Sequence, residues 1–152
     1  MVTLKDESGF GRYVRLRQPG TDDSAETKER LMEFSDEVYF KARGVLGDAL
    51  ARITSPAAWT KFTGARDLDG NPVSPISSSA CQYCATGAIV SSSDAQYVLS
   101  EAAYELLGIA IGVPPIDNYG VPIYAPNISC WNDAKERTHA EVVAAFEKAI
   151  AI

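Results

Sequence analysis

The stretch CWNDAKERTHAEVVAAFEKAI, residues 130–150, holds a cysteine, an Asn-Asp pair and the only histidine of the chain. Within it, Thr138 and Glu141 form a capping box, in which each side chain satisfies a backbone N–H group left free by the first turn of a helix. Apolar residues then recur three and four positions apart, the spacing of an amphipathic helix. The stretch therefore predicts a helix that begins near Thr138 and runs through Ile152.

Three further helices are predicted upstream by the same spacing. Residues 24–53 lack proline and place apolar side chains on one helical face. Residues 79–90, SACQYCATGAIV, form a short buried helix whose small residues permit close packing. The helix DAQYVLSEAAYELLGIAIG, residues 94–112, should end at Gly112, because glycine adopts the left-handed conformation that terminates helices.

Local signals refine these predicted helices. Ser93 and Gln96 match a second capping box, which would open the helix over residues 94–112. Gly44 and Gly47 each weaken a helix interior by about 0.5–1 kcal/mol relative to alanine. We therefore expect a kink, a break into two helices or the close approach of another backbone near these glycines.

Two stretches rich in turn-forming residues are predicted to be long loops. In residues 54–79, the sequence DLDGNPV favours a turn or a small hairpin, because Gly70 tolerates a positive φ and Pro72 restricts the backbone that follows. Trp59 and Phe62 are expected to pin this loop to the core. Residues 113–130 contain four prolines and form the second loop, which could end in a short strand at residues 127–131.

These elements predict a mainly α fold of about four helices, with long loops pinned by the two tryptophans and with a small hairpin or short strands. Residues 24–152 are expected to form one compact domain, preceded by a flexible segment, residues 1–23, with at most one short strand. The expected core consists of Phe34, Val38, Leu46, Trp59, Cys84, Ile89, Leu106, Leu107, Trp131, Val142 and Phe146.

Composition limits the class of protein. The 152 residues, 46% hydrophobic and 22% charged, are typical of a soluble globular domain. No apolar run is long enough to cross a bilayer, and the charged start lacks the apolar core of a signal peptide. We therefore expect no membrane partner. The expected location is the cytoplasm of a bacterial host, with a virion as the alternative.

Charge argues against a nucleic-acid partner. The net charge is −6, whereas proteins that bind phosphate backbones need a basic face. Arg12, Arg15 and Arg17 are interpreted as the solvated side of a short strand, with a local basic patch as the alternative.

The cysteines and the histidine support three chemical hypotheses. Three cysteines and one histidine would make a Cys3His zinc site, and zinc is the one cofactor that these residues suggest. The pair C-x-x-C at residues 81–84 would alternatively support disulfide exchange at a helix start. A third arrangement has Cys84 as nucleophile, His139 as base and Asp133 or Asn132 orienting the ring, as in a small hydrolase or transferase. The candidate zinc ligands are Cys81, Cys84, Cys130 and His139.

A structural interpretation competes with all three hypotheses. Free cysteine behaves as a small buried hydrophobe, so Cys81 and Cys84 are most simply core residues. Asn132 and Asp133 are good turn and capping residues, and His139 is tolerated in the first turn of a helix.

The order of AAWTK, ARDLDGNPV, YCATGAI and WNDAKERTHAEVVAAFEKAI resembles a family of small uncharacterised proteins, a domain of unknown function found in bacteria and their phages. The resemblance covers residues 42–152. Cys81 and Cys130 lie outside its motifs, and the family admits Gln at His139, which weakens the zinc, dithiol and triad hypotheses. The matching positions are Tyr83, Cys84, Gly87, Ala88, Trp131, Asn132, Asp133, Thr138, Glu141 and Val142, with Trp59 and Gly70 as lesser ones.

Because the family has no assigned activity, the resemblance indicates which family the chain is similar to but does not indicate a reaction. A well-built core without a persuasive catalytic set favours a non-enzymatic binding or accessory module that acts through a protein partner, which could be a second copy. An inhibitor of a host system and a minor virion component both fit this description. The predicted binding residues are Trp59, Trp131, Asn132 and Asp133.

Overall fold

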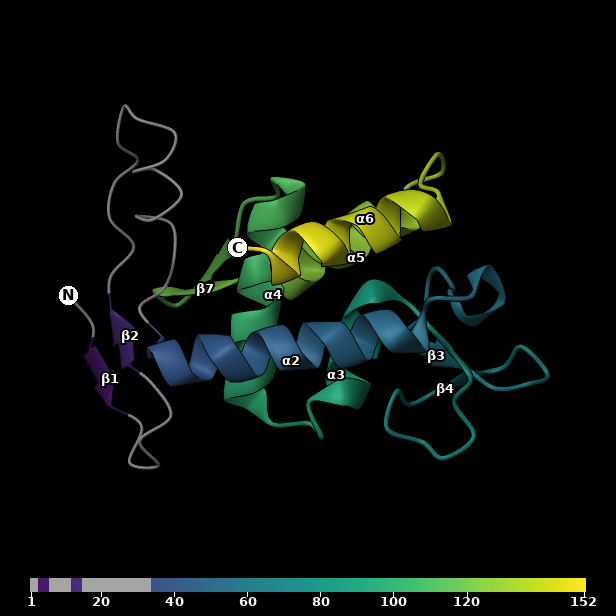
Figure 1. The fold of residues 1–152 in the computed structure, drawn as a ribbon, viewed down its shortest axis with the longest axis horizontal. Helices are drawn as coiled ribbons and strands as arrows, with labels where there is room; N and C mark the ends of the chain where they lie inside the picture. Colours follow the sequence, from purple (N-terminus) through teal and green to yellow (C-terminus); the bar gives the residue numbers. More distant parts are fainter. Residues whose placement is uncertain (1–2, 6–11, 15–33) are drawn as a thin grey trace.

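Five α-helices dominate the described residues, 3–5, 12–14 and 34–152, of the computed structural model (Figure 1). The prediction of a mainly α fold is confirmed, although one helix more than the expected four is present. The helices are α2 (Asp36–Arg52), α3 (Ala85–Ser92), α4 (Tyr97–Ile111), α5 (Ala125–Asp133) and α6 (His139–Ile150), with a 3-10 turn, η1 (Pro56–Ala58), after α2.

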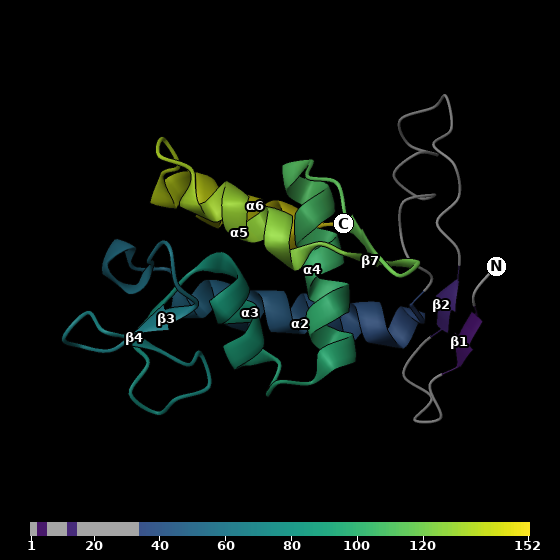
Figure 2. The same ribbon diagram turned by 180° about the vertical axis from the view of Figure 1, so that it is seen from behind.

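The helices cross in layers. Figure 1 shows α2 and α6 running lengthwise beside each other, with α4 crossing behind both, and Figure 2 shows α4 and α5 from the opposite side. Helix α4 contacts α2, α3, α5 and α6. Its position explains why its sequence is apolar on almost every face, because a helix packed on all sides cannot keep a polar stripe.

The predicted core is largely confirmed. Nine of its eleven members are buried: Phe34, Val38, Leu46, Cys84, Ile89, Leu106, Leu107, Val142 and Phe146. Trp59 and Trp131 are only partly buried and pack against the edge of this core. Large indole rings seldom fit completely inside a small domain, which leaves them at the boundary between core and loops.

Short strands form three small antiparallel sheets in the described residues. β1 (Thr3–Lys5) pairs with β2 (Arg12–Val14), so the N-terminal part holds two strands where one at most was expected. The rest of residues 1–23 and residues 24–33 lie outside the described part of the chain. β3 (Ala65–Arg66) lies between β4 (Pro72–Val73) and β5 (Gln82–Tyr83), and β6 (Ile116–Asn118) pairs with β7 (Val121–Ile123).

Two helix-end predictions are confirmed. The Thr138 hydroxyl accepts a hydrogen bond from the Glu141 N–H, and the Glu141 carboxylate accepts one from the Thr138 N–H. Gly112 ends α4 with φ of 75°, in the left-handed region where glycine carries no steric penalty.

Other local predictions are wrong. Ser93 ends α3 instead of capping α4, and the Gln96 side chain makes no capping bond. Helix α2 continues through Gly44 and Gly47 without a break, and a methyl group added at either glycine would meet no atom within 4 Å. The helix expected over residues 79–90 begins only at Ala85, after the strand β5.

Helix α5 was missed because of its proline. Residues 113–130 were expected to be a loop, with a strand at residues 127–131, yet α5 begins at Ala125. Pro126 lies in its first turn, where proline is tolerated because the missing N–H group would have no helical partner. In the described residues, no helix is long and apolar enough to span a bilayer.

Candidate functional site

Asn132, in the last turn of α5, joins three separate segments of the chain. Its side chain is fully buried at 0% exposure. Its Oδ1 accepts hydrogen bonds from Trp59 Nε1 at 2.8 Å and from the Ala85 N–H at 3.1 Å. Its Nδ2 donates to the Thr60 carbonyl at 3.2 Å and to Asp133 Oδ1 at 2.9 Å. The amide therefore uses both donors and accepts two bonds, which fixes the end of α5 to the start of α3 and to the chain after η1.

Asp133 extends this network to the loop over residues 59–64, named here the anchored loop. Its Oδ1 accepts a hydrogen bond from the Phe62 N–H at 2.9 Å. Phe62 has φ of 69°, a left-handed conformation that bulky residues rarely adopt. Its ring is 75% exposed, so the prediction that Phe62 pins the loop inward is wrong. Trp59 instead holds the loop against the core, through its hydrogen bond to Asn132.

Arg66 and Lys61 tie the anchored loop to its neighbours. The Arg66 guanidinium donates to the carbonyls of Lys61 at 3.2 Å and of Gly70 at 3.0 Å, which links the loop to the β3–β4 hairpin. Lys61 Nζ donates to the Ala134 carbonyl at 2.7 Å, in the connection between α5 and α6. At the hairpin tip, Leu68 is 92% exposed. Two apolar side chains therefore protrude from loops that side-chain bonds hold together.

The residues of the proposed catalytic triad each bond to other groups. Cys84 caps the start of α3, its Sγ accepting from the Gly87 N–H at 3.3 Å, and it is only 5% exposed. His139 Nε2 lies 2.6 Å from the Ile53 carbonyl, which can only accept, so Nε2 carries the proton. The Asp133 carboxylate binds Phe62 and Asn132. No hydrogen bond joins Cys84, His139 and Asp133 to one another in this described region.

The four candidate zinc ligands, all within residues 34–152, are not assembled. Cys81 is partly buried, with Sγ 3.6 Å from the Arg66 carbonyl, whereas Cys130 is exposed on α5. Among the described residues, no three of His, Cys, Asp or Glu are placed to hold a metal ion together.

Trp131 lies outside the Asn132 network, although the sequence grouped it with Asn132 and Asp133. The Arg137 guanidinium stacks 4.1 Å from the centre of its ring, and Arg137 Nε donates to the Trp131 carbonyl at 3.0 Å. These contacts shape the connection between α5 and α6. Trp59 instead lies inside the network, with its ring 6.0 Å from that of His139.

Glu101 is a titratable residue that sequence reasoning missed. It lies partly buried on α4, and burial raises the pKa of its carboxyl from 4.5 to about 7. Burial, followed by the nearby Glu101 and Cys84, also raises the pKa of the Tyr104 hydroxyl above its ordinary value. Nothing in the sequence distinguishes Glu101 from a solvated helix carboxylate, because the shift depends on the surrounding packing.

Replacing Glu101 with glutamine is expected to stabilise the protein at pH 8 and to have little effect at pH 4. Below pH 4.5 the carboxyl is neutral in both folded and unfolded states. As the pH rises towards 7 the unfolded chain ionises first, so the wild type loses stability. A shift of one pKa unit equals about 1.4 kcal/mol, and partial exposure reduces the full difference to about 1–2 kcal/mol.

Urea unfolding at both pH values measures this difference. Glu147→Gln, which alters an exposed carboxylate on α6, is the matched control and should change stability by a similar small amount at each pH. Equal behaviour of the two variants would show that Glu101 ionises normally.

A protein-family model, described as a family of unknown function (DUF6197), matches residues 40–152. This match agrees with the resemblance deduced over residues 42–152. No curated protein and no solved structure matches the chain significantly.

Proposed function

We propose that the chain, which belongs to the family of unknown function DUF6197, is a non-enzymatic binding module that acts through a protein partner. The observation that carries this proposal is the presentation of Phe62. A residue in the left-handed region costs about 1–3 kcal/mol and persists only where neighbouring contacts impose it. Here the Asp133 carboxylate imposes it, and the result is an exposed aromatic ring.

The anchored loop has the properties of a contact surface. Aromatic side chains, phenylalanine among them, are enriched in protein interfaces relative to the rest of the surface. A loop that is rigid before binding loses less conformational entropy when it docks. Asn132 and Asp133 therefore act by holding Phe62 in place, whereas the ring itself would enter the partner. Leu68, on the neighbouring hairpin, supplies a second apolar contact.

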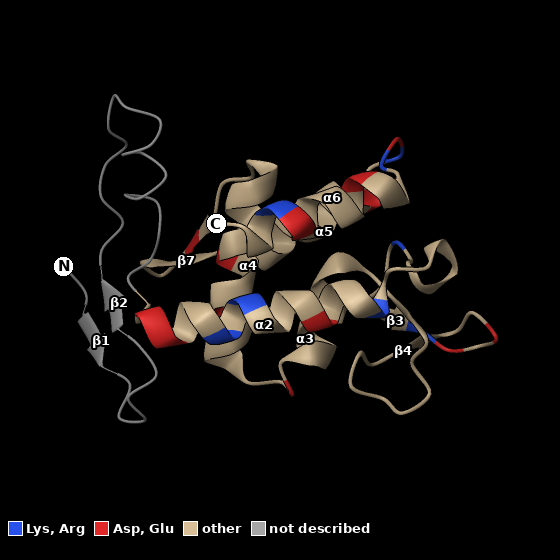
Figure 3. Ribbon diagram, in the orientation of Figure 1, with Lys and Arg blue, Asp and Glu red and all other residues tan. Residues whose placement is uncertain are grey.

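Charges around the anchored loop indicate the chemistry of the partner. Lys61 binds the backbone of the connection between α5 and α6, so Lys135 and Arg137 lie at the same end of the molecule. Figure 3 shows Lys and Arg positions on that connection and near β3, with Asp and Glu positions beside them on the connection and along the β3–β4 loop. Asp67 and Asp69 flank Leu68, and Glu136 follows Lys135, so the surface that fits is an apolar pocket with side chains of both charges at its rim. Such a contact would serve an inhibitor of a host system, encoded by a phage or prophage, or a minor virion component.

Phe62→Ala is expected to weaken partner binding at least about 30-fold, the effect of losing an interface hot spot worth roughly 2 kcal/mol. Phe40→Ala is the matched control, because Phe40 on α2 is 76% exposed and outside the anchored loop. The measurement is quantitative mass spectrometry of proteins retained from host lysate by the immobilised full chain, followed by affinity titration of the retained protein.

Two further results decide this proposal. Asp133→Ala should weaken the same interaction while leaving the Phe62 ring present, because the loop loses its conformational restraint. A partner retained equally by Phe62→Ala and Phe40→Ala would place the interface elsewhere. If Phe62→Ala dissociates an oligomer in sedimentation experiments, the partner is a second copy of the chain.

A further inference from the structure

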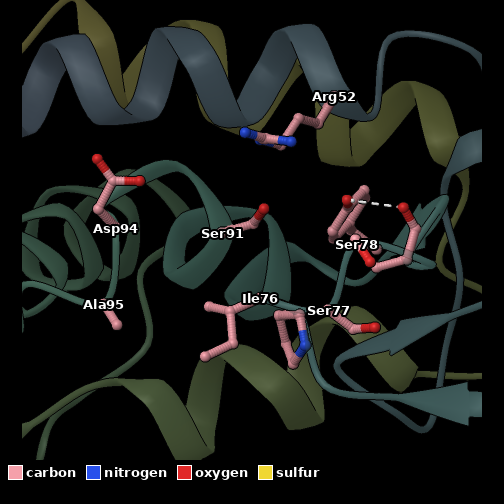
Figure 4. Close-up of a pocket in the computed structure, with 10 residues that line it drawn as sticks. Arg52, Ile76, Ser77, Ser78, Ser91, Asp94 and Ala95 are labelled. Carbon is pink, nitrogen blue, oxygen red and sulfur yellow. Dashed lines mark hydrogen bonds between the residues drawn. The ribbon is translucent and has the colours of Figure 1, made fainter.

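A cavity of about 530 Å³ opens between the C-terminal ends of α2 and α3 and the loop over residues 74–80 (Figure 4). This volume is within the range of about 300–1,000 Å³ that is usual for small-molecule sites. None of its lining residues belongs to the anchored loop or to the Asn132 network, although Pro75 and Tyr83 contact the loop at Gly64 and Thr60. Its polar lining consists of Arg52, Ser77, Ser78, Tyr83, Ser91 and Asp94.

Arg52 is an exposed side chain at the wall of this cavity, with two contacts that orient it. Its Nε donates to the Ser92 hydroxyl at 2.9 Å, and its guanidinium lies 5.7 Å from the centre of the Tyr83 ring. These contacts leave the two terminal amino groups without a hydrogen-bond or ion-pair partner among the described residues. Figure 4 shows the guanidinium facing the cavity, opposite Ser91.

Serine hydroxyl groups add hydrogen-bond donors to the cavity beside Arg52. Ser78 and Ser91 make no side-chain hydrogen bond within the described part of the chain, whereas Ser77 is paired with Ser79. An arginine fork with hydroxyl donors nearby matches the oxygens of a carboxylate or a phosphate group. Arg52 and Ser78 are exposed and Ser91 is partly buried, so a ligand would replace the water that these donors bind in the free protein.

The rim of the cavity is strained. Asp94 and Ala95 are consecutive residues with φ of 52° and 56°, and both line the cavity. Two adjacent left-handed residues other than glycine are costly, and such strain clusters at functional sites. The Asp94 carboxylate also places a negative charge on the rim, which opposes the approach of an anion.

We propose that this cavity binds the oxyanion of a small ligand, a carboxylate or a phosphate group, through Arg52, Ser78 and Ser91. The terminal amino groups of Arg52 donate to two oxygens, and the serine hydroxyls donate to the remaining lone pairs. Asp94 limits the affinity for ligands with more than one negative charge.

The test is an NMR titration of the full chain, with inorganic phosphate and acetate added separately at constant ionic strength. Saturable shifts are expected at Arg52 Nε and at the amides around Ser78 and Ser91. Arg52→Gln should lower the affinity at least tenfold. Arg43→Gln, the same change on α2 at an arginine bonded to the Ile152 carbonyl, should leave it unchanged.

Asp94→Asn provides a second measurement that does not depend on Arg52. Removal of this like charge should strengthen binding of the same anion severalfold. Saturation by phosphate alone or by acetate alone supports the site and identifies the ligand group. Shifts that never saturate with either anion, or an affinity that is the same in Arg52→Gln, would overturn the proposal.

Discussion

Asn132→Ala is expected to lower the free energy of unfolding by about 3 kcal/mol or more, since unpaired buried polar groups cost about 1–3 kcal/mol each. The substitution removes four hydrogen bonds at once. It leaves the Trp59 indole N–H, the buried Ala85 N–H and the Thr60 carbonyl without their partner. Ala85 contributes most, because its amide is inaccessible to water.

Thermal and urea unfolding measure this loss. For a domain of this size, each kcal/mol corresponds to about 2–4 °C, so a fall in Tm of roughly 6–12 °C is expected. Asn127→Ala is the matched control, because Asn127 is also on α5 and makes one exposed bond, to the Pro114 carbonyl at 2.8 Å. It should cost under about 1 kcal/mol. Similar losses in both variants would mean that Asn132 is an ordinary capping residue.

The same substitution should also weaken partner binding. Without Asn132, the Trp59 ring and the Thr60 carbonyl lose the bonds that position the anchored loop. Destabilisation and loss of binding are separable, because Phe62→Ala is expected to weaken binding at least about 30-fold with little effect on stability. Asn132 therefore connects the rigidity of the fold to the proposed contact surface.

Local signals predicted the helix ends that depend on neighbours in sequence. The capping box at Thr138 and the left-handed Gly112 involve contacts within a few residues, and both are confirmed. The Ser93 pattern matched the same rule but is wrong, because its hydroxyl bonds to the Ser100 hydroxyl at 2.7 Å and to the Val90 carbonyl. Tertiary packing decides between such competing partners.

The candidate site depends on contacts that are distant in sequence. Trp59 and Ala85 bind Asn132 from 73 and 47 positions away. The sequence singled out Trp59, Asn132 and Asp133, and the structure brings these three together, but their role in binding stays a prediction. Phe62 was misjudged because its left-handed backbone is imposed by Asp133, 71 positions further on. No local pattern contains that information.

Gly87→Ala is expected to destabilise the protein by about 3 kcal/mol or more, the upper part of the range for overpacked positions. Gly87 lies in the first turn of α3, and a methyl group there would be 1.9 Å from the Gly64 carbonyl oxygen and 2.7 Å from its carbon. Rotation of a side chain cannot relieve this overlap, because both atoms belong to the backbone of the anchored loop.

The same substitution at Gly47 is expected to have the opposite effect on stability. Gly47 lies inside α2 with no atom within 4 Å of an added methyl group, so alanine should stabilise that helix by about 0.5–1 kcal/mol. Helix propensity alone predicts a gain at both glycines, whereas backbone packing predicts opposite signs. Urea unfolding of the two variants therefore separates these effects, and a gain at Gly87 would show that the anchored loop is free to move away from α3. In that event the restraint on Phe62 would also be weaker than its hydrogen bond to Asp133 implies, and rigid presentation of the ring would no longer support the proposed interface.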